Sequence, residues 1–437
     1  MLSRRHFLAS SLALPALAPF SKISAQRADS LRVAVIGIAN RGADNLAGVA
    51  HEKIVALCDV DPAHSHKARG QFPQAEYFTD YRQMFDKMAK EIDAVVVSTP
   101  DHTHAHAALL AMSLGKPTYC EKPLARTVGE VRRMRNAAQK HKVITQMGTQ
   151  IHAENNYRRV VEIVQSGLLG PIETVHVWLG NGPPNCVQVE KGPKIPFDIA
   201  QWQGPTTNEF FYADVSKSGH KFTWPHFNWR YFWEYGGGQL GDFGCHFMDL
   251  PFWALGLGAP TRVQASGQGR TPEVGVNEVP VTMDVEYQFP AREKAPAVTL
   301  HWSHGFKGPK IDGERKPFAG YGNGVLFIGK NGSLVADYSR HKLMPDEFAK
   351  DVKRPEQSIP KSLGHHKEWL AAIRGNGKTL CNFDYSGNLA EAVLLGNVAY
   401  RAQSAIEWDS ANLKATNSGK ANELIDPAPR KGWEYPV

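Results

Sequence analysis

Two segments far apart in the sequence carry side chains that could move a proton while a hydride leaves a carbon. Lys122 lies in the segment 121–124 (EKPL), and Asp242 and His246 are four residues apart. An imidazole can accept a hydroxyl proton because its ordinary pKa lies near neutral pH. A lysine can donate a hydrogen bond to the same oxygen, and Asp242 could hold the hydroxyl or orient Lys122. This set predicts the oxidation of an alcohol.

Each of these residues could instead have a structural role. A lysine before a proline can be a solvated loop residue, and polar pairs at i and i+4 are common on helix surfaces. His102, His104 and His106 alternate in a way that could suggest a metal site. We expect them to straddle a turn and a helix start, where they need not converge, and no cysteine or acidic cluster accompanies them. No metal is predicted, and His104 is expected near the cofactor.

A cofactor that accepts hydride is predicted from residues 31–59. The apolar segment 31–36 suits a buried parallel strand, and a turn containing Gly37 and Gly42 leads from it into a helix. A second strand, 54–58, ends at Asp59, whose carboxylate can accept the ribose hydroxyls of a dinucleotide. Asp59 would also repel a 2′-phosphate, which favours NAD over NADP. Ala39 replaces the middle glycine of the usual pattern and should push the backbone slightly away from the pyrophosphate.

The alternation of strands and helices continues to about residue 150. It predicts an α/β Rossmann domain over residues 31–150, with a doubly wound parallel sheet. The further helices are expected at 81–90, 105–114 and 128–140, and the further strands at 94–98, 118–120 and 143–147. Ligands of such sheets bind at the carboxyl ends of the strands. The residues expected to contact the cofactor are Gly37, Ile38, Asn40, Arg41, Gly42, Asp59, Thr99, Pro100, His104, Glu121 and Lys122.

From residue 172 the pattern changes to strands without intervening helices. It predicts an α+β second domain, residues 151–405, with an open, largely antiparallel sheet that packs one face on the cofactor domain. The candidate strands are 172–179, 262–267, 281–289, 298–304, 325–328 and 334–338. Helices return at 364–374 and 388–403. A polar C-terminal arm, 406–437, is expected to cross the surface or a neighbouring subunit.

Eight aromatic residues crowd the fourteen positions from Phe222 to Tyr235, directly before Asp242. Flat aromatic faces suit the apolar faces of sugar rings, but aromatic clusters pack domain junctions more often. Trp229, Arg230 and Tyr235 are the candidates for contact with a substrate. Arg230 could clamp a carboxylate or pair with an acid.

Three segments resemble the Gfo/Idh/MocA family of glucose–fructose oxidoreductase and inositol dehydrogenase. They are 98–104 (STPDHTH), 121–125 (EKPLA) and 236–246 (GGGQLGDFGCH), and the likeness extends over nearly all of the chain after residue 26. The resemblance implies that Lys122, Asp242 and His246 surround the substrate. It also implies a homo-oligomer formed through the free face of the second-domain sheet. Asp101 departs from the family pattern, in which asparagine is commoner.

The resemblance implies an NAD-dependent oxidoreductase that acts on a hydroxyl of a sugar, polyol or glycoside, with a tightly held cofactor. Some relatives instead hydrolyse glycosides by transient oxidation and elimination, but the characteristic members of that kind lack the EKP segment. A third alternative, mildly favoured by Ala39, is a non-catalytic sugar-binding or assembly protein. A binder needs no proton acceptor beside a hydride path, so Lys122 and His246 argue against it.

Residues 1–26 are predicted to be a twin-arginine signal peptide. The segment 3–8 (SRRHFL) matches the motif, an apolar run follows to Phe20, and 23–25 offers a small-residue cleavage site. The run is too short to span a bilayer, which needs about 20 residues, and two prolines interrupt it. We therefore expect export to the periplasm by the twin-arginine machinery, which carries folded proteins and so allows a cofactor to be loaded first.

Composition excludes other classes of protein. The net charge is +7, but three basic residues lie in the expected signal peptide and the others are scattered, so nucleic-acid binding is not expected. Five widely spaced cysteines without a CxxC pair argue against a zinc ribbon or a disulfide framework. The 437 residues are too many for one ordinary core and fit two domains.

Overall fold

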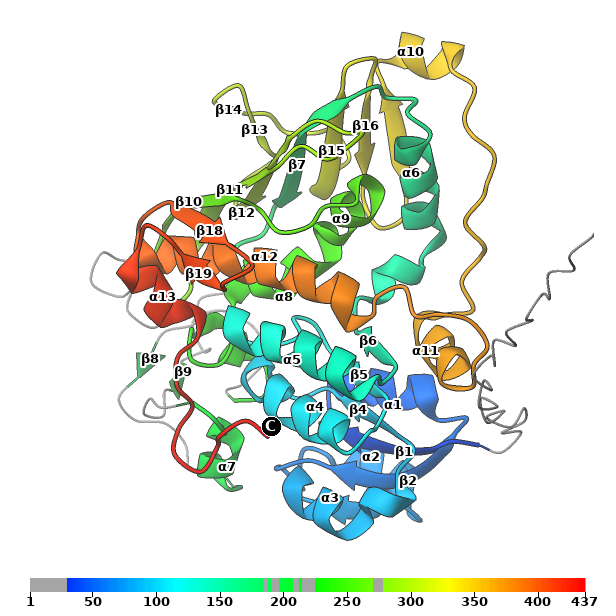
Figure 1. The fold of residues 1–437 in the computed structure, drawn as a ribbon, viewed down its shortest axis with the longest axis vertical. Coiled ribbons are helices and arrows are strands. Elements are labelled where there is room, and N and C mark those ends of the chain that lie inside the picture. Colours follow the sequence, from blue (N-terminus) through cyan, green and yellow to red (C-terminus); the bar gives the residue numbers. More distant parts are fainter. Residues whose placement is uncertain are drawn as a thin grey trace, which may run out of the picture.

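The computed structural model contains two domains, each built on a sheet, with the first domain below the second in Figure 1. It describes residues 30–183, 188–189, 196–206, 212–213, 225–269 and 278–436. The predicted signal peptide, 1–26, lies outside the described residues. Within the described ranges, no helix has both the length and the apolar character needed to cross a membrane.

The first domain is built on a six-stranded parallel sheet in the order β3-β2-β1-β4-β5-β6. All four residues of the central strand β4 (Ala94–Val97) are buried, because layers of helices cover both faces of the sheet. The predicted doubly wound sheet is therefore confirmed. The other strands are β1 (Arg32–Ile36), β2 (Lys53–Cys58), β3 (Glu76–Phe78), β5 (Thr118–Cys120) and β6 (Thr145–Met147).

The helices of this domain follow its strands, and one of them begins earlier than expected. Helix α4 starts at Asp101, because Pro100 is extended at the N-cap and an acidic side chain is favourable in the first turn of a helix. The expectation that His102, His104 and His106 straddle a turn is wrong, since all three lie in α4. The helices are α1 (Arg41–Val49), α2 (His66–Gln71), α3 (Tyr81–Met88), α4 (Asp101–Ser113) and α5 (Val128–His141), with a 3-10 turn at Ala89–Glu91.

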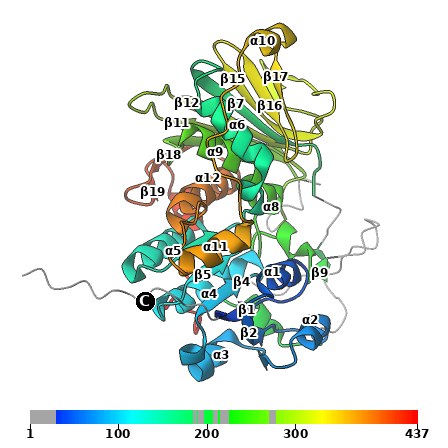
Figure 2. The same cartoon turned by 90° about the vertical axis from the view of Figure 1, so that its right-hand side faces the viewer.

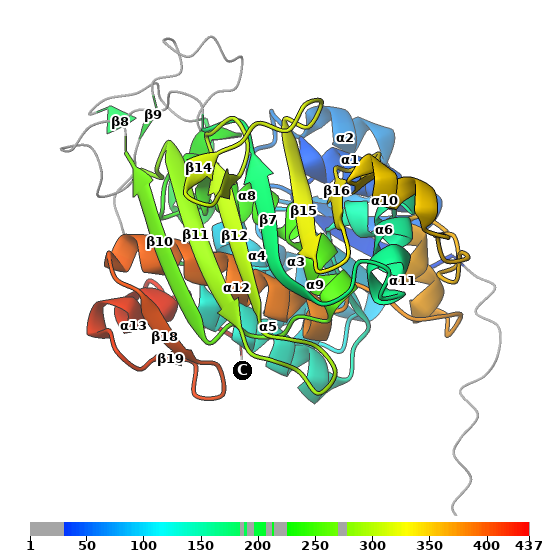
Figure 3. The same ribbon diagram turned by 90° about the horizontal axis from the view of Figure 1, so that it is seen from above.

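The second domain carries a nine-stranded sheet in the order β17-β16-β15-β7-β12-β11-β10-β18-β19. Neighbouring strands are antiparallel except β7 and β12, which confirms the predicted open, largely antiparallel sheet. Strand β11 (Thr282–Phe289) alternates half-buried and buried residues, because helices cover only the face away from the viewer in Figure 3. The other strands are β7 (Ile172–Leu179), β10 (Arg262–Gln268), β12 (Val298–His304), β15 (Asn323–Gly329), β16 (Ser333–Ala336), β17 (His341–Met344), β18 (Ile406–Asp409) and β19 (Lys414–Ala415). Two small hairpins add β8 (Gln188–Val189) with β9 (Tyr212–Ala213), and β13 (Lys310–Ile311) with β14 (Glu314–Arg315).

The expectation that no helices interrupt the strands of this domain is wrong. Helices α8 (Gly238–Phe247) and α9 (Asp249–Leu255) lie between β7 and β10, and buried Leu240, Gly244 and Phe247 give α8 its inward face. Helix α12 (Phe383–Ala402) crosses between the sheet and the first domain and is buried along most of its length (Figure 1). The remaining helices are α6 (Asn155–Gln165), α7 (Ile199–Gln203), α10 (Asp346–Asp351), α11 (His365–Ile373) and α13 (Gly419–Ile425), with 3-10 turns at Gln150–Ala153 and Asn228–Tyr231.

Late segments of the chain return to the first domain. Helix α11 lies beside α1 (Figure 2), and its His366 contacts Asn45 with Nε2 2.9 Å from Oδ1. Strand β18, at the start of the expected arm, pairs with β10 as part of the sheet. The chain then reaches α4 and α5, where Trp433 is buried and Tyr435 donates a hydrogen bond to Glu130 at 2.8 Å. The arm thus covers the first domain of its own subunit.

Candidate active site

A cavity of about 320 Å³ lies where the carboxyl ends of the first-domain strands face the second domain. Gly37, Asp59, Thr99 and Glu121, which follow β1, β2, β4 and β5, line one side of it. The second domain contributes Trp229, Arg230 and His246. Lys122 lines the same cavity, so the structure brings the predicted amine and imidazole together at the mouth of the glycine turn.

The two glycines of the turn, Gly37 and Gly42, stand where the backbone leaves no room for a side chain. Gly37 has a φ of +78°, and a Cβ there would lie 2.6 Å from the Ser98 carbonyl oxygen. A Cβ on Gly42 would lie 2.0 Å from the Gly37 carbonyl oxygen. Helix α1 begins directly after this turn, and Ala39, Asn40 and Arg41 at its start line the cavity. This is the arrangement that a pyrophosphate requires, so the residues present fit a dinucleotide.

Replacement of Gly42 by alanine is expected to weaken NAD binding at least about tenfold, because the turn must open to admit the methyl group. Titration of the purified protein with NAD, followed by tryptophan fluorescence, measures this loss. Gly258 has open space around its Cβ position and φ in the ordinary range, so Gly258→Ala is the matched control. Equal NAD affinity in wild type and Gly42→Ala would contradict this account of the turn.

Asp59 is held at the end of β2 by the backbone. Its carboxylate accepts the amide hydrogens of Ile38 and Asp61, both at 3.0 Å. Burial raises the pKa of Asp59 to about 6, although these hydrogen bonds and the charge of His226 oppose the shift. The side chain of Ile38 is fully buried, so Ile38 contributes to the site through its backbone amide, which is bonded to Asp59. Asp59 is therefore ionised at neutral pH and ready to accept ribose hydroxyls.

The affinity for NAD is expected to fall several-fold between pH 7 and pH 5. The sign follows from the raised pKa of Asp59, since below pH 6 the carboxyl gains a proton and ceases to be a charged acceptor. Fluorescence titrations with NAD across this range measure the effect, and Asp59→Asn should bind weakly with a flat profile. A pH-dependent loss that persists in Asp59→Asn would assign it to another group, such as the neighbouring Asp61–His226 pair.

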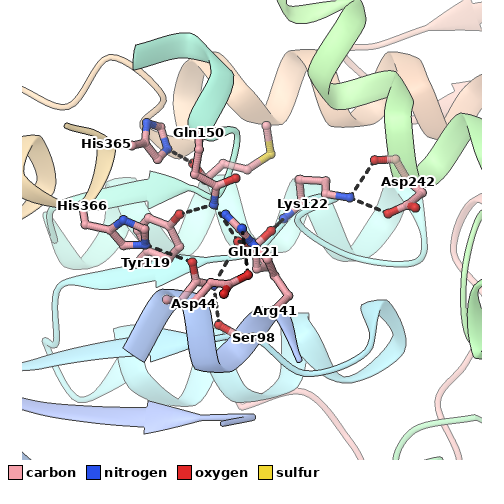
Figure 4. Close-up of polar contacts among 12 residues, drawn as sticks. Arg41, Asp44, Ser98, Tyr119, Glu121, Lys122, Gln150, Asp242, His365 and His366 are labelled. Atoms are coloured by element: carbon pink, nitrogen blue, oxygen red, sulfur yellow. Dashed lines mark hydrogen bonds and ion pairs between the residues drawn. The ribbon is translucent and has the colours of Figure 1, made fainter. Parts of the chain in front are cut away.

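Glu121 is the centre of the polar network drawn in Figure 4. Its Oε1 accepts hydrogen bonds from Arg41 (3.2 Å), Asn45 (2.9 Å) and Gln150 (2.7 Å). Burial would raise the pKa of Glu121, but the charges of Arg41 and Lys122 outweigh it and lower that pKa. The Oε2 atom also accepts the Lys122 amide hydrogen at 3.2 Å. Glu121, predicted as a cofactor contact, therefore also fixes the backbone from which Lys122 extends.

Lys122 reaches across the cavity to helix α8. Its Nζ donates to Asp242 Oδ1 at 2.5 Å and to the Asp242 carbonyl at 2.7 Å (Figure 4). Arg230 places Nε 3.5 Å from the same Oδ1 and stacks on the ring of Trp229 at 4.2 Å. Burial would raise the pKa of Asp242, but the charges of Lys122 and Arg230 hold it well below its usual range. Of the two roles expected for Asp242, orienting Lys122 is the one that these contacts support.

His246 lies one helical turn beyond Asp242 on α8, as the i,i+4 spacing predicts. Burial, together with the charge of Lys122, lowers the pKa of His246 to about 3. The expectation that this pKa lies near neutral pH is therefore wrong. The imidazole is neutral, and its buried Nδ1 has no hydrogen-bond partner among the described residues. His246 also lines the cavity, which places its ring within reach of a ligand bound there.

The other histidines of the segment 102–106 point to separate partners. His102 contacts the Trp202 carbonyl at 2.8 Å, and His106 contacts the Trp433 carbonyl. His104 lines the cavity, but its two nitrogens lie 2.6 and 2.8 Å from the carbonyls of Thr99 and Pro123. It therefore joins the loop after β4 to the loop after β5, which is a positioning role. Thr99 and Pro100 line the cavity beside it.

The aromatic segment divides between the cavity and the core. Trp229 and Arg230 line the cavity, whereas Tyr235 is fully buried, does not line it, and packs against His102 and Trp202 at ring distances of 5.0 and 4.9 Å. We therefore reassign Tyr235 from substrate contact to the packing of the domain junction. Two more of the eight aromatic residues, Phe222 and Trp224, lie outside the described residues.

Two features of the site were not singled out in the sequence. Gln150, which follows β6, donates to both Tyr119 and Glu121, and its position after a parallel strand could have indicated it. Behind the site, Asp249 accepts hydrogen bonds from His152 Nδ1 (2.9 Å) and the Tyr385 hydroxyl (2.7 Å). His152, Asp249 and Cys381 form a buried cluster of potential ligand atoms, but hydrogen bonds already occupy the Asp249 carboxylate. These contacts tie α9 and α12 to the 3-10 turn that follows β6.

Comparisons with known sequences match both domains. Residues 31–149 match a family model described as "Oxidoreductase family, NAD-binding Rossmann fold", and residues 213–335 match the "GFO/IDH/MocA C-terminal domain". Inositol 2-dehydrogenase from Salmonella typhimurium is 28% identical over 153 residues, which are 34% of this chain and 45% of that protein. A glycosyl hydrolase family 109 protein from a Shewanella species is 30% identical over 164 residues, 34% of each chain. The chain thus matches less than half the length of these relatives.

Solved structures share the whole architecture. The WlbA dehydrogenase from Chromobacterium violaceum, solved with NADH and UDP-GlcNAcA, is similar with a TM-score of 0.61 and 18% identity over 89% of this chain and 99% of that one. GenD2 from gentamicin A biosynthesis, solved with NAD, gives a TM-score of 0.59 and 18% identity over 90% and 100% of the two chains. At this identity the likeness shows the fold alone. Since the two family models together span more than half of the sequence, the chain belongs to the Gfo/Idh/MocA oxidoreductase family and has its NAD-binding Rossmann domain.

Proposed function

We propose that this protein is an NAD-dependent oxidoreductase that acts on a hydroxyl group of a sugar, polyol or glycoside. One observation carries the proposal: the Lys122 amine, held by Asp242, and the ring of His246 line the cavity onto which the Gly37 turn opens. A purely structural role would not require the half-buried amine of Lys122 to line the same cavity as the dinucleotide turn. Desolvation of the Lys122–Asp242 pair is costly unless the charges are used.

The residues divide the work on the substrate. When bound, NAD supplies the hydride acceptor. Lys122 donates a hydrogen bond to the substrate oxygen, and its contacts with Asp242 keep the amine pointed across the cavity. Neutral His246, which lines the cavity, accepts the hydroxyl proton. Trp229 offers an aromatic face to a sugar ring, and Arg230, stacked on it, offers donors to further hydroxyl or carboxylate oxygens.

Release of the cofactor from denatured protein tests the first half of the proposal. The supernatant should contain about one NAD(H) per chain if the cofactor is tightly held. The holoprotein is then incubated with a panel of sugars, polyols and glycosides while the absorbance of reduced nicotinamide is followed. A lasting reduction by one class of alcohol is the expected result. The dehydrogenase proposal would be refuted if the protein bound added NAD but no alcohol of the panel reduced that NAD.

A glycosidase that works by transient oxidation and elimination is the second candidate. It is supported by the similarity to the glycosyl hydrolase family 109 protein. The sequence identity to that protein, 30%, is close to the 28% identity to the inositol 2-dehydrogenase. The EKP segment at 121–123 favours net oxidoreduction. The same substrate panel separates the two, because glycoside cleavage without net reduction of the cofactor would select the glycosidase.

Export and self-association complete the proposal. We propose that the twin-arginine motif at 3–8 directs the protein to the periplasm, and that copies associate through the free face of the nine-stranded sheet. Replacing Arg4 and Arg5 by lysine should leave the protein in the cytoplasm when cell fractions are compared. The mass in solution, from light scattering, should be a multiple of that of the chain.

A further inference from the structure

A second cavity lies away from the candidate active site, between the two domains. It has a volume of about 90 Å³, and its walls are the start of α5, the start of α8, the second half of α12 and the end of α13. We call it the arginine pocket, and define it by Arg126, Glu234, Gly237, Asn397 and Arg401, with exposed Glu423 at its rim. Among the described lining residues, it shares none with the active-site cavity.

The two arginines of this pocket are half-buried and lack the partners that enclosed guanidinium groups normally have. Neither Arg126 nor Arg401 makes a hydrogen bond or ion pair with a described residue, and Arg126 Nε is buried without an acceptor. Arg401 lies over the Trp233 ring at 5.3 Å, which leaves its donors free. Burial and the charge of Arg126 lower the pKa of Arg401 to about 10. A buried donor without a partner is costly, and two such cations repel each other.

The pocket adds two further polar features. Helix α8 begins at its wall, and the N-cap, Gly237, provides no side-chain cap, so the positive end of the helix faces this region. Glu234, which is 9% exposed, lines the same wall without an ion pair to either arginine. The two guanidinium groups can donate hydrogen bonds to the oxygens of an anion, and the carboxylate of Glu234 can accept one. This combination matches an oxyanion that still carries a proton. Phosphate near neutral pH has such a proton, and sulfate does not.

We propose that the arginine pocket binds a free phosphate-like oxyanion, with Arg126 and Arg401 donating to its oxygens and Glu234 accepting its P–OH hydrogen. The small volume favours a free ion over the phosphate group of a larger molecule. Because α8 carries Asp242 and His246 and the pocket also touches α5 and α12, the bound ion joins the two domains behind the active site.

Thermal unfolding of the protein saturated with NAD tests the proposal, since NAD keeps phosphate out of the dinucleotide turn. Inorganic phosphate is titrated at constant ionic strength, with chloride as the balancing salt. The expected result is a saturating rise in Tm of about 2 °C when phosphate reaches ten times its Kd. Arg126→Gln and Arg401→Gln should lose the rise, and Arg354→Gln, at an exposed arginine outside the pocket, should keep it. No saturating rise, or a rise that survives both substitutions, overturns the proposal.

A second variant keeps the test decisive if the arginine variants fail to fold. Glu234→Gln removes the carboxylate that repels a fully ionised anion and supplies an amide donor. Wild type should respond to phosphate more strongly than to sulfate, and Glu234→Gln should respond to both alike. The pocket would be excluded as the site if phosphate and sulfate raised the Tm of the wild type equally and Glu234→Gln left both rises unchanged.

Discussion

Lys122→Met is expected to lower kcat by about a thousandfold while the affinity for NAD stays within about twofold of wild type. Methionine fills nearly the same volume as lysine but has no amine to donate to a substrate oxygen. It also removes the contacts at 2.5 and 2.7 Å by which Asp242 and the amine hold each other. The glycine turn and Asp59 are untouched, so the cofactor site is preserved. Steady-state kinetics with the substrate found in the panel, together with an NAD titration, measure both quantities.

Lys90→Met is the matched control, because Lys90 is exposed in the 3-10 turn after α3 and does not line the cavity. It should retain wild-type kcat. If Lys122→Met also turned over at the wild-type rate, Lys122 would have no part in the reaction. If Lys122→Met lost NAD affinity as well, the amine would act on the cofactor, among whose expected contacts it stands, and not on the substrate alone.

Local patterns in the sequence were enough to predict the parallel sheet of the first domain and the turn after its first strand. The segment 94–97 is apolar throughout because helices cover both faces of β4, whereas β11 alternates because one face of its sheet is free. Gly37 and Gly42 can be recognised from the sequence because the backbone of this turn excludes any side chain at these two positions, so that only glycine fits there. The four-residue spacing of Asp242 and His246 placed both on one face of α8. In each case the determining neighbours lie close in sequence or repeat with a fixed period.

The failed predictions depend on contacts between distant segments. The polar residues 101–104 are typical of a loop, but they open α4, where His102 is held by Trp202 and His104 by Pro123. Tyr235 has the residue type of a sugar contact, but it is buried beside His102. The lowered pKa of His246 has the same origin, since the surrounding protein supplies the desolvation. Residue type and spacing do not indicate which side chains another domain will bury.

His246→Gln is expected to lower kcat by about a hundredfold, because glutamine fills the site but offers no basic nitrogen. The effect should be smaller than that of Lys122→Met, since a base with a pKa of about 3 has little driving force for proton transfer. The same pKa fixes the pH dependence. Because the imidazole is already neutral above its pKa, wild-type kcat at saturating NAD should stay flat through about pH 6.5, where an ordinary histidine titrates.

This profile separates the effect of His246 from that of Asp59, whose pKa is raised to about 6. Asp59 acts on NAD affinity, so its effect disappears once NAD is saturating, whereas a titration of His246 would remain in kcat. His51→Gln, at an exposed histidine far from the cavity lining, should match wild type. A wild-type kcat that falls as pH drops through 6.5, with the fall absent in His246→Gln, would mean that water reaches the imidazole. The second domain would then shield the reacting atoms less than the burial of His246 Nδ1 indicates.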